Sequence, residues 1–327
     1  MLFFFRENIS DPAINLAIEE HLLRNIQTEE DILLFYINAP SVIVGRHQNV
    51  FEEINLEYAE ANKIEVLRRL SGGGAVYHDQ GNLNYSIITK KAPENVHNFR
   101  KFTEPVAQAL NAMGIPATLN QRNDILIHEY KISGNAQYVT TQRMVHHGTL
   151  LFNSDLSLLS NVLLTKPQKI ESKSIKSVRS KVANIIEFLP KPMDMQTFCQ
   201  HLIAQLSITL HHHEIPPYTP STEEWSAINQ LANERYRNWE WNYGHSPDST
   251  IHKTINSPQG EVIITLQIQQ GIVKSLHLMS NQDYKALENW LTGIRYMRAD
   301  IAAALRHLTD SQLIPGVSRE DLLSALI

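Results

Sequence analysis

Residues 68–82 combine side chains and backbone that suit an anionic ligand. They read Arg-Arg-Leu-Ser-Gly-Gly-Gly-Ala-Val-Tyr-His-Asp-Gln-Gly-Asn. Arg68 and Arg69 are cationic, and the three glycines let backbone N–H groups approach a ligand because no Cβ stands in the way. Apolar residues flank the glycines on both sides, whereas a flexible linker would be polar. The pattern therefore indicates contact with an anion, and the alternation of a strand lets only one arginine face it, leaving the other as a surface charge.

The residues after the glycines exclude the two best-known phosphate loops. A P-loop continues with Gly-Lys-Ser/Thr into a helix, and a dinucleotide fingerprint opens a helix with G-x-G-x-x-G. Here Val76 and Tyr77, and then residues 83–89, have the composition of strands. We therefore predict a glycine loop between strands. His78 fits a turn or a ligand contact equally well, and the Asn82 amide is able to fix a ligand group.

A second group of polar residues lies on either side of a predicted tight turn at residues 129–130. Asn123 and Asp124 precede the turn, and Lys131 follows it on a strand. Gly134 and Ala136 leave room nearby for a bulky ligand. The Lys131 ammonium could neutralise a phosphate and stabilise a developing oxyanion. Asp124 could bind Mg²⁺ or orient the lysine.

Other reactive residues have simpler interpretations. His146 and His147 are neighbours on a predicted strand, so their rings face opposite ways and cannot chelate one ion. The single cysteine, Cys199, lies in an amphipathic helix and reads as a packed thiol. The histidine run 211–213 reads as a helix-end surface feature, and we predict no structural zinc. Residues 171–181 read as an exposed basic loop that could order around phosphates as a lid, through Ser177, Arg179 and Lys181.

Hydrophobic periodicity and turn residues predict an α+β chain in two parts. A larger part, residues 1–245, contains antiparallel hairpins and flanking helices, and a smaller α+β part, 246–327, follows an aromatic-rich irregular stretch at 239–247. Predicted strands cover 2–5, 32–37, 42–44, 64–69, 75–77, 83–89, 124–128, 131–133, 136–141, 144–152, 261–269 and 272–279. One predicted helix is capped by Asp11 and has Ile14, Ala17, Ile18 and Leu22 on one buried face. Further predicted helices cover 99–113, 155–166, 194–212, 222–235, 282–291, 298–308 and 318–326.

Composition narrows the classes of function. The net charge is −5, so a dedicated nucleic-acid binder is not expected. No apolar run reaches the length of about 18 residues that a membrane span needs. One cysteine permits no internal disulfide, and we expect a cytoplasmic protein.

Taken together and in order, these segments closely resemble the lipoate–protein ligase A family over nearly the full length. The motifs that carry the resemblance are Asp11-Pro12 with Asn15-Leu16-Ala17-Ile18-Glu19-Glu20, Val44-Gly45-Arg46-His47-Gln48-Asn49, Arg68-Arg69 with Ser71-Gly72-Gly73-Gly74-Ala75-Val76-Tyr77-His78-Asp79, Asn123-Asp124-Ile125, Lys131-Ile132-Ser133-Gly134-Asn135-Ala136, His147-Gly148-Thr149-Leu150-Leu151 and Ser177-Val178-Arg179-Ser180-Lys181-Val182-Ala183-Asn184. Lys181 and Ala183 stand where arginine and threonine are usual in that family.

The resemblance implies a large domain of mixed, mainly antiparallel sheet, like class II aminoacyl-tRNA synthetases and biotin ligases, and a small C-terminal accessory domain. It implies that ATP, with Mg²⁺, activates lipoate to lipoyl-AMP, and that the lipoyl group then passes to a lysine of a lipoyl domain. The acceptors would be 2-oxoacid dehydrogenase acyltransferase subunits and the glycine cleavage H protein. The enzyme would act as a monomer.

The resemblance also assigns residues. Lys131 would be catalytic, touching both phosphate and acyl carbonyl, and Glu19 or Glu20 would lie near the lipoyl end or the pocket mouth. The residues implied to bind ATP and lipoyl-adenylate are Arg69, Ser71, Gly72, Gly73, Gly74, Ala75, Val76, Tyr77, His78, Asn82, Asn123, Asp124, Lys131 and Ala136.

Three alternatives remain. An octanoyl- or lipoyltransferase of the same fold would work without ATP through a cysteine thioester, but Cys199 is far in sequence from the glycine loop. A biotin–protein ligase would carry an arginine-rich nucleotide loop, which is absent. A degenerate binder would hold the adenylate without transferring it, which the intact Lys131 motif disfavours.

Overall fold

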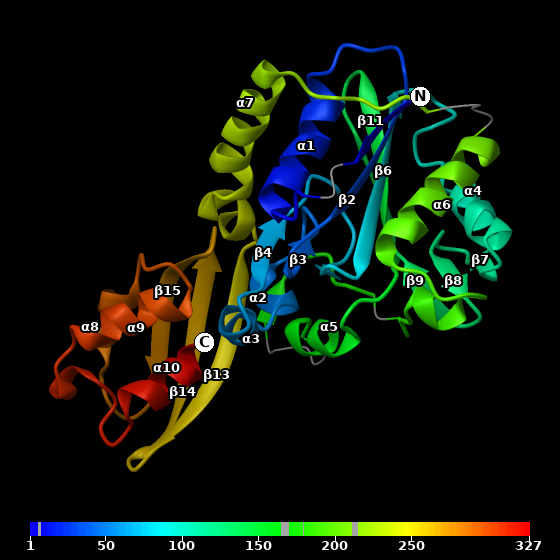
Figure 1. The fold of residues 1–327 in the computed structure, drawn as a ribbon. Coiled ribbons are helices and arrows are strands. Elements are labelled where there is room, and N and C mark those ends of the chain that lie inside the picture. The colour runs from blue at the N-terminus through cyan, green and yellow to red at the C-terminus, as the bar shows by residue number, and fades with distance from the viewer. Residues whose placement is uncertain (6–7, 165–169, 179, 211–214) are drawn as a thin grey trace.

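The computed structural model describes residues 1–5, 8–164, 170–178, 180–210 and 215–327. A five-stranded sheet in the order β1-β2-β6-β11-β10 forms the centre of the larger part (Figure 1). Its strands are β1 (Leu2–Phe5), β2 (Ile32–Ile37), β6 (Asn82–Lys90), β11 (Arg143–Leu151) and β10 (Asn135–Val139). β1 and β2 are parallel and the other neighbours antiparallel, so the sheet is mixed and mainly antiparallel, as predicted.

Helices cover both faces of this sheet. Successive side chains of β2 point to opposite faces, as the pleat requires. Leu34 and Tyr36 join the core against α1 (Pro12–Arg24) and α7 (Thr222–Leu231). Leu33 and Phe35 join the core formed with α4 (Phe99–Ala112) and α6 (Met195–Thr209). Figure 1 shows the two helix pairs on opposite sides. Burial on both faces explains why β2 is a continuous apolar run.

Two three-stranded sheets hold the segments that carry the polar motifs. The first has the order β4-β3-β5, from β4 (Glu65–Arg68), β3 (Ser41–Val44) and β5 (Val76–His78). It packs with the short helices α2 (Val50–Glu53), α3 (Leu56–Ala61) and α5 (Leu156–Val162). The second has the order β7-β8-β9, from β7 (Ala117–Leu119), β8 (Ile125–Ile127) and β9 (Tyr130–Ser133). The glycine loop therefore connects β4 to β5, and Lys131 lies on β9.

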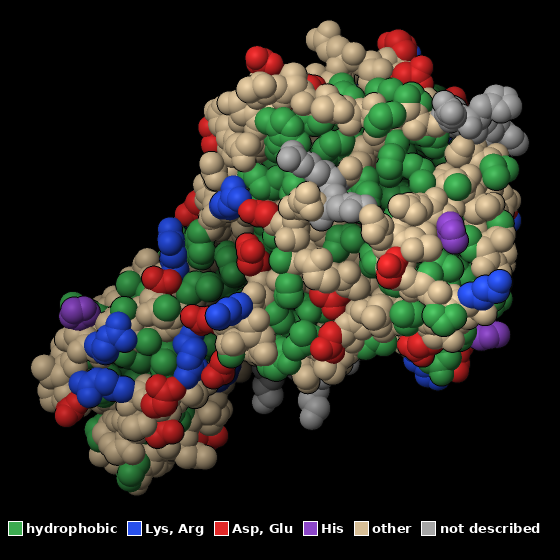
Figure 2. Space-filling view, in the orientation of Figure 1, with side chains coloured by type: hydrophobic (Ala, Val, Ile, Leu, Met, Phe, Trp, Pro, Cys, Tyr) green, Lys and Arg blue, Asp and Glu red, His purple; other side chains and the backbone are tan. Residues whose placement is uncertain are grey.

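The C-terminal part has a four-stranded antiparallel sheet in the order β12-β13-β14-β15. Its strands are β12 (Ile170–Ser172), β13 (Ser249–Ser257), β14 (Gly260–Gln269) and β15 (Ile272–Met279). Helices α8 (Lys285–Leu291), α9 (Arg298–Arg306) and α10 (Arg319–Leu326) share one core with it. β12 lies far from β13 in the sequence. Its pairing with β13 therefore joins the chain at residues 170–172 to the C-terminal sheet. Acidic and basic side chains are interspersed over the face in Figure 2.

Several local predictions were wrong. The predicted C-terminal hairpin is present as β14 and β15, but the two further strands of its sheet were not anticipated, because the polar strand β13 and the short β12 carry weak alternation. The stretch predicted as irregular contains a π-helical turn at Glu240–Gly244. Gly134 is no tight turn but joins β9 directly to β10. The short elements α2, α3 and β7 were not anticipated, and the histidine run 211–213 lies outside the described residues. No helix in the described part of the chain is long and apolar enough to cross a membrane.

Candidate active site

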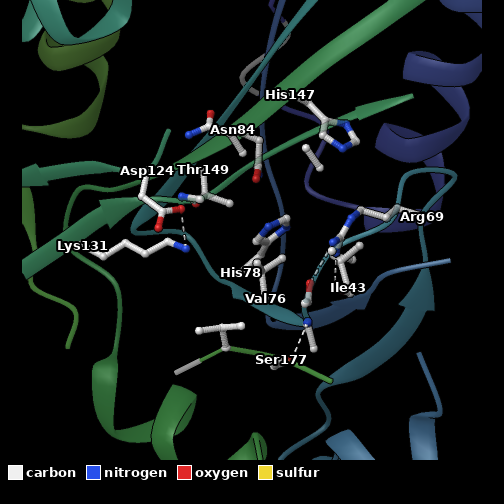
Figure 3. A pocket seen from close by; sticks show the side chains of 18 of the residues that line it. Ile43, Arg69, Val76, His78, Asn84, Asp124, Lys131, His147, Thr149 and Ser177 are labelled. Carbon is white, nitrogen blue, oxygen red and sulfur yellow. Dashed lines mark hydrogen bonds and ion pairs between the residues drawn. The ribbon is translucent and has the colours of Figure 1, made fainter. Parts of the chain in front are cut away.

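A cavity of about 300 Å³ lies between the glycine loop, the start of β9, residues 175–178 and Ser180. In Figure 3, Asp124 and Lys131 lie on one side, Arg69 and Ile43 on the other, and His78 and Val76 between them. The lining residues are Leu16, Tyr36, Ile43, Arg69, Gly73, Gly74, Ala75, Val76, His78, Asn84, Arg122, Asp124, Lys131, Gly134, Asn135, Ala136, His147, Gly148, Thr149, Ile175, Lys176, Ser177, Val178 and Ser180. The cavity thus has aliphatic and aromatic walls as well as paired charges.

The Arg69 side chain holds the glycine loop in shape. Its Nη2 donates to the carbonyl oxygens of Gly72 at 2.7 Å and Gly74 at 2.8 Å, and its Nε donates to Ser71 Oγ at 3.0 Å. Burial lowers the pKa of Arg69 to about 10, so the guanidinium stays charged at neutral pH. Gly73 has φ +91°, a conformation that L side chains rarely adopt. The loop's shape therefore depends on one glycine and one buried cation.

Arg68 is not the surface charge that strand alternation predicted. It is fully buried, and its guanidinium donates to the carbonyl oxygens of Gly45 at 2.9 Å and Gln48 at 2.8 Å. Further bonds reach the Asn242 carbonyl and Ser246 Oγ. Sequence patterning missed this because the partners are carbonyl groups that only tertiary folding brings around the arginine. Arg68 therefore ties the strand before the loop to the chain near 242–246.

Lys131 and Asp124 form an ion pair at the edge of the cavity. Lys131 Nζ lies 2.8 Å from Asp124 Oδ1, and the two side chains are 25% and 15% exposed. Asn120 donates to the other carboxylate oxygen at 3.1 Å, which fixes Asp124. A Cβ at Gly134 would meet Lys131 Nζ at 3.1 Å, so that glycine makes room for the ammonium itself. The prediction that Asp124 could orient the lysine agrees with this geometry.

Residues 173–178, here called the covering segment, lie over the glycine loop. Ser177 Oγ accepts from the Ala75 N–H at 3.0 Å and donates to Glu53 Oε2 at 2.5 Å. The Ser177 N–H donates to Glu53 Oε1 at 3.2 Å, and Gln48 Nε2 donates to Ser177 Oγ at 3.0 Å. The segment predicted as an exposed loop is therefore attached at Ser177 through Glu53, which the sequence did not single out.

The other two residues predicted for a lid have different outcomes. Lys181 points to Glu129, with Nζ 3.1 Å from Oε2, and does not line the cavity. The backbone of Lys181 instead accepts from the Lys131 N–H at 2.8 Å, which joins the end of this region to β9. Arg179 lies outside the described residues.

Two histidines reach the cavity from different strands. His78 is buried, and its Nδ1 lies 3.0 Å from Asn38 Nδ2. Burial, with the nearby Arg69 and His147, lowers the pKa of His78 to about 3. His147 Nδ1 lies 2.9 Å from both carboxylate oxygens of Glu19, and its Nε2 lies 2.7 Å from Ser71 Oγ. The cavity therefore contains one neutral imidazole and one that is held by a buried carboxylate.

Glu19 and Glu20, which were predicted near the lipoyl end or the pocket mouth, do not line the cavity. Glu19 is 3% exposed beneath His147, and Glu20 is 2% exposed and bonded to Arg24 and to the Tyr236 hydroxyl. Burial alone would raise the pKa of Glu19, but His147, Ser86 and Arg69 outweigh it and the pKa is lowered. Glu19 therefore supports a cavity residue and does not line the cavity.

His146 confirms the prediction that neighbouring imidazoles face opposite ways. It packs against Phe102 on the other side of the sheet, with ring centroids 5.1 Å apart. Its pKa is lowered to about 3, by burial first and His147 second.

Most of the predicted binding residues meet at the cavity, and several do not. Those that line it are Arg69, Gly73, Gly74, Ala75, Val76, His78, Asp124, Lys131, Ala136 and Ser177. Predicted residues that do not line it are Ser71, Gly72, Tyr77, Asn82, Asn123 and Lys181. Tyr77 packs into a core, because it alternates with Val76 and His78 on β5. Asn82 donates instead to Asn84, which does line the cavity and was missed.

Family models match both parts of the chain. Residues 11–207 match the model of the lipoyl protein ligase A/B catalytic domain, and residues 246–326 match that of the bacterial lipoate protein ligase C-terminus. With the α+β fold and the charged cavity, these matches define an enzyme of the lipoyl protein ligase A/B class.

Individual relatives specify the family further. The chain is 44% identical to lipoate-protein ligase LplJ of Bacillus subtilis, over 100% of both chains. A crystal structure of lipoate-protein ligase A bound with ATP has a TM-score of 0.66 and 31% identity, covering 75% of this chain and 98% of that one. A structural study of a bi-partite lipoate protein ligase and its E2 lipoyl domain from Thermoplasma acidophilum gives a TM-score of 0.66 and 31% identity, covering 75% of this chain and 96% of that one. The chain belongs to the lipoate–protein ligase family.

Proposed function

We propose that this enzyme activates lipoate with ATP and transfers the lipoyl group to a lysine of a lipoyl domain. The observation that carries the proposal is the cavity, in which a lysine–aspartate pair faces a glycine loop beside apolar walls. The ATP-bound relative supports a nucleotide as one substrate. The lipoate carboxylate would attack the α-phosphate, pyrophosphate would leave, and the acceptor amine would then displace AMP from the acyl carbonyl.

The reaction needs positioning and charge neutralisation more than a protein nucleophile. Lys131 would neutralise the α-phosphate and the acyl carbonyl oxygen, where negative charge develops in both steps. The N–H groups of residues 74–77 and the Arg69 cation would hold the anionic junction of carboxylate and phosphate. Leu16, Tyr36 and Ile43 line the cavity and would contact the apolar acyl chain.

The covering segment would close the site during the first step. Ser177 holds it to the glycine loop and to Glu53. A closed segment excludes water, which would otherwise hydrolyse a mixed anhydride. Release of the same segment would then admit the acceptor lysine.

One carboxylate is available for a magnesium ion. Asp124 is the only acidic side chain among the described residues that line the cavity, and its oxygens already contact Lys131 and Asn120. Mg²⁺ commonly binds one or two carboxylates together with substrate phosphates. The residues therefore fit an ion that enters with ATP, held by Asp124, where it would offset phosphate charge.

The identity of the acceptor protein and the roles of the two parts of the chain belong to the same proposal. The archaeal relative studied with its E2 lipoyl domain supports lipoyl domains of 2-oxoacid dehydrogenase complexes as acceptors, with the glycine cleavage H protein as a second candidate. Residues 1–245 would carry both half-reactions. Residues 246–327 would act as an accessory domain that influences the covering segment through β12, which pairs with β13.

The rival reaction is transfer from an acyl-thioester without ATP. Cys199 lies buried on α6 in the core and does not line the cavity. The test is pyrophosphate release measured with and without lipoate, followed by the mass shift of a purified lipoyl domain. We expect both signals to require ATP and lipoate, and lipoylation without ATP would overturn the proposal.

A further inference from the structure

Two buried asparagines lie behind His78 in a fixed orientation. Asn15 Nδ2 lies 3.1 Å from the Ile9 carbonyl oxygen, 3.2 Å from that of Ile37 and 2.8 Å from Asn38 Oδ1. The Ile9 and Ile37 neighbours are backbone carbonyl oxygens, which can only accept, so the nitrogen of Asn15 must be the atom that faces them. That nitrogen also contacts Asn38, which must therefore turn its oxygen toward Asn15. The Asn38 nitrogen therefore faces the other way.

The Asn38 nitrogen faces His78. It lies 3.0 Å from His78 Nδ1, and an amide NH₂ group can only donate. His78 Nδ1 must accept, so the imidazole proton resides on Nε2. His78 is 3% exposed and lines the cavity, and its Nε2 has no hydrogen-bond partner among the described residues. A buried N–H without a partner is costly, which indicates a place for a ligand acceptor.

We propose that Asn38, held by Asn15, is a positioning residue that fixes His78 as a neutral Nε2–H donor to an oxygen atom of the bound substrate. The oxygen belongs to a carboxylate or a phosphate, the two anionic groups of the proposed reaction. The inference rests on the proposed function for the ligand, but the hydrogen-bond relay itself is a property of the free protein. Its donor is available over a wide pH range, because the pKa of His78 is lowered to about 3 by burial and the nearby Arg69 and His147.

The second cavity histidine has a partner at each ring nitrogen. The Glu19 carboxylate can only accept, so His147 Nδ1 carries a proton. Ser71 Oγ accepts from Arg69 Nε at 3.0 Å and lies 2.7 Å from His147 Nε2, so Ser71 is the partner of that nitrogen. Of the two cavity histidines, only His78 therefore presents an N–H that no described residue accepts. The two histidines therefore differ in what they can bind: His78 can donate to a ligand, whereas both ring nitrogens of His147 have partners in the protein.

Nitrogen NMR of the ligand-free protein tests the relay directly. In protein with ¹⁵N-labelled histidine, long-range ¹H–¹⁵N correlations distinguish the two tautomers, and His78→Gln assigns the His78 signals. We expect protonated Nε2 in the wild type. Asn38→Asp keeps the bond from Asn15 and replaces the donor with an acceptor, so the proton should move to Nδ1. Wild-type His78 protonated on Nδ1, or a tautomer that Asn38→Asp leaves unchanged, would overturn the inference.

Calorimetry with each substrate alone tests what the donor serves. We expect Asn38→Asp to weaken binding of lipoate, ATP or both by roughly 10- to 100-fold, the scale of one hydrogen bond to a charged group. Weakening of lipoate alone identifies the carboxylate, and weakening of ATP alone identifies the phosphate. The control is Asn111→Asp, since the Asn111 amide on α4 is also a donor, to the carbonyl groups of Ala107 and Ala117, but lies outside the cavity lining. Unchanged binding of both substrates by Asn38→Asp would refute the role. A wild type that binds neither substrate would instead refute the proposed function and leave the tautomer result standing.

Discussion

Substitution of Lys131 by methionine removes one of the cations that line the cavity and keeps the length of the side chain. Lys131 Nζ lies 2.8 Å from Asp124 Oδ1, and the lysine side chain is 25% exposed. At a separation of about 4 Å and an effective dielectric of about 20, one charge pair with phosphate is worth about 4 kcal/mol. Partial exposure reduces this value toward the roughly 2.7 kcal/mol measured for a lost oxyanion donor. We therefore expect lipoate-dependent pyrophosphate release to slow by roughly 10²- to 10³-fold.

Two further variants separate the loss of the Lys131 charge from the other effects of the substitution. Methionine at position 131 leaves the Asp124 carboxylate without its cation, so part of the loss is repulsion of phosphate. Adding Asp124→Asn removes that repulsion, but it also removes the carboxylate proposed to hold Mg²⁺, so the double variant should stay well below the wild-type rate. Lys181→Met is the matched control, because the Lys181 backbone is bonded to Lys131 while its side chain pairs with Glu129 in solvent. The assay is continuous pyrophosphate release with thermal unfolding as a check on folding. Wild-type rates in a folded Lys131→Met enzyme would refute the assigned role.

Three other substitutions test the loop, the rival mechanism and the buried histidine. Gly73→Val places a branched side chain at φ +91°, with its Cβ 3.0 Å from Arg69 Nη2. The strain in the backbone costs roughly 1–3 kcal/mol, so we expect the variant to lose adenylate formation. Gly72→Ala should keep the activity, because its Cβ meets nothing within 4 Å. Cys199→Ala should retain full transfer to a lipoyl domain and cost roughly 1 kcal/mol of stability as a small core deletion, and an inactive folded variant would favour the thioester rival. His146 has a pKa of about 3 in the folded chain. Below about pH 6.5 the imidazole therefore binds a proton in the unfolded chain but not in the folded one, so the free energy of unfolding falls as the pH falls from about 6.5 toward 3. His146→Phe should remove about 2.7 kcal/mol of that loss at pH 4.5, measured by urea unfolding at pH 7 and 4.5, and an unchanged pH dependence would contradict the burial argument.

The sequence predicted the parts of the site that are local in the chain. Three glycines between apolar strands, and a lysine that opens a strand near Asp124, need no tertiary information to be recognised, and both lie at the cavity. The loop residues also divide as strand alternation predicts, since Val76 and His78 line the cavity and Tyr77 packs in the core. Periodicity likewise predicted the central sheet and its long helices, because their apolar faces are long and regular.

The sequence could not predict contacts that only the fold brings together. Glu53 holds Ser177 from 124 positions away, and Arg68 is enclosed by carbonyl groups of distant segments. Asn38 touches His78 across 40 positions, and nothing in its neighbours distinguishes it from a turn asparagine. β12 is only three residues long, and its pairing with β13 depends on the whole C-terminal sheet. These features are tertiary, and composition carries no local signal for them.

The central claim is that the cavity makes lipoyl-adenylate before any acceptor is present. The direct measurement is mass spectrometry of the small molecules that stay with the protein after gel filtration from ATP, magnesium and lipoate. We predict lipoyl-adenylate bound to the protein and an equal amount of pyrophosphate released into solution, neither of which forms when ATP or lipoate is omitted. Addition of an unmodified lipoyl domain should then consume the adenylate and shift the mass of the domain by one lipoyl group. A domain that becomes lipoylated while no adenylate forms at any stage would contradict the account.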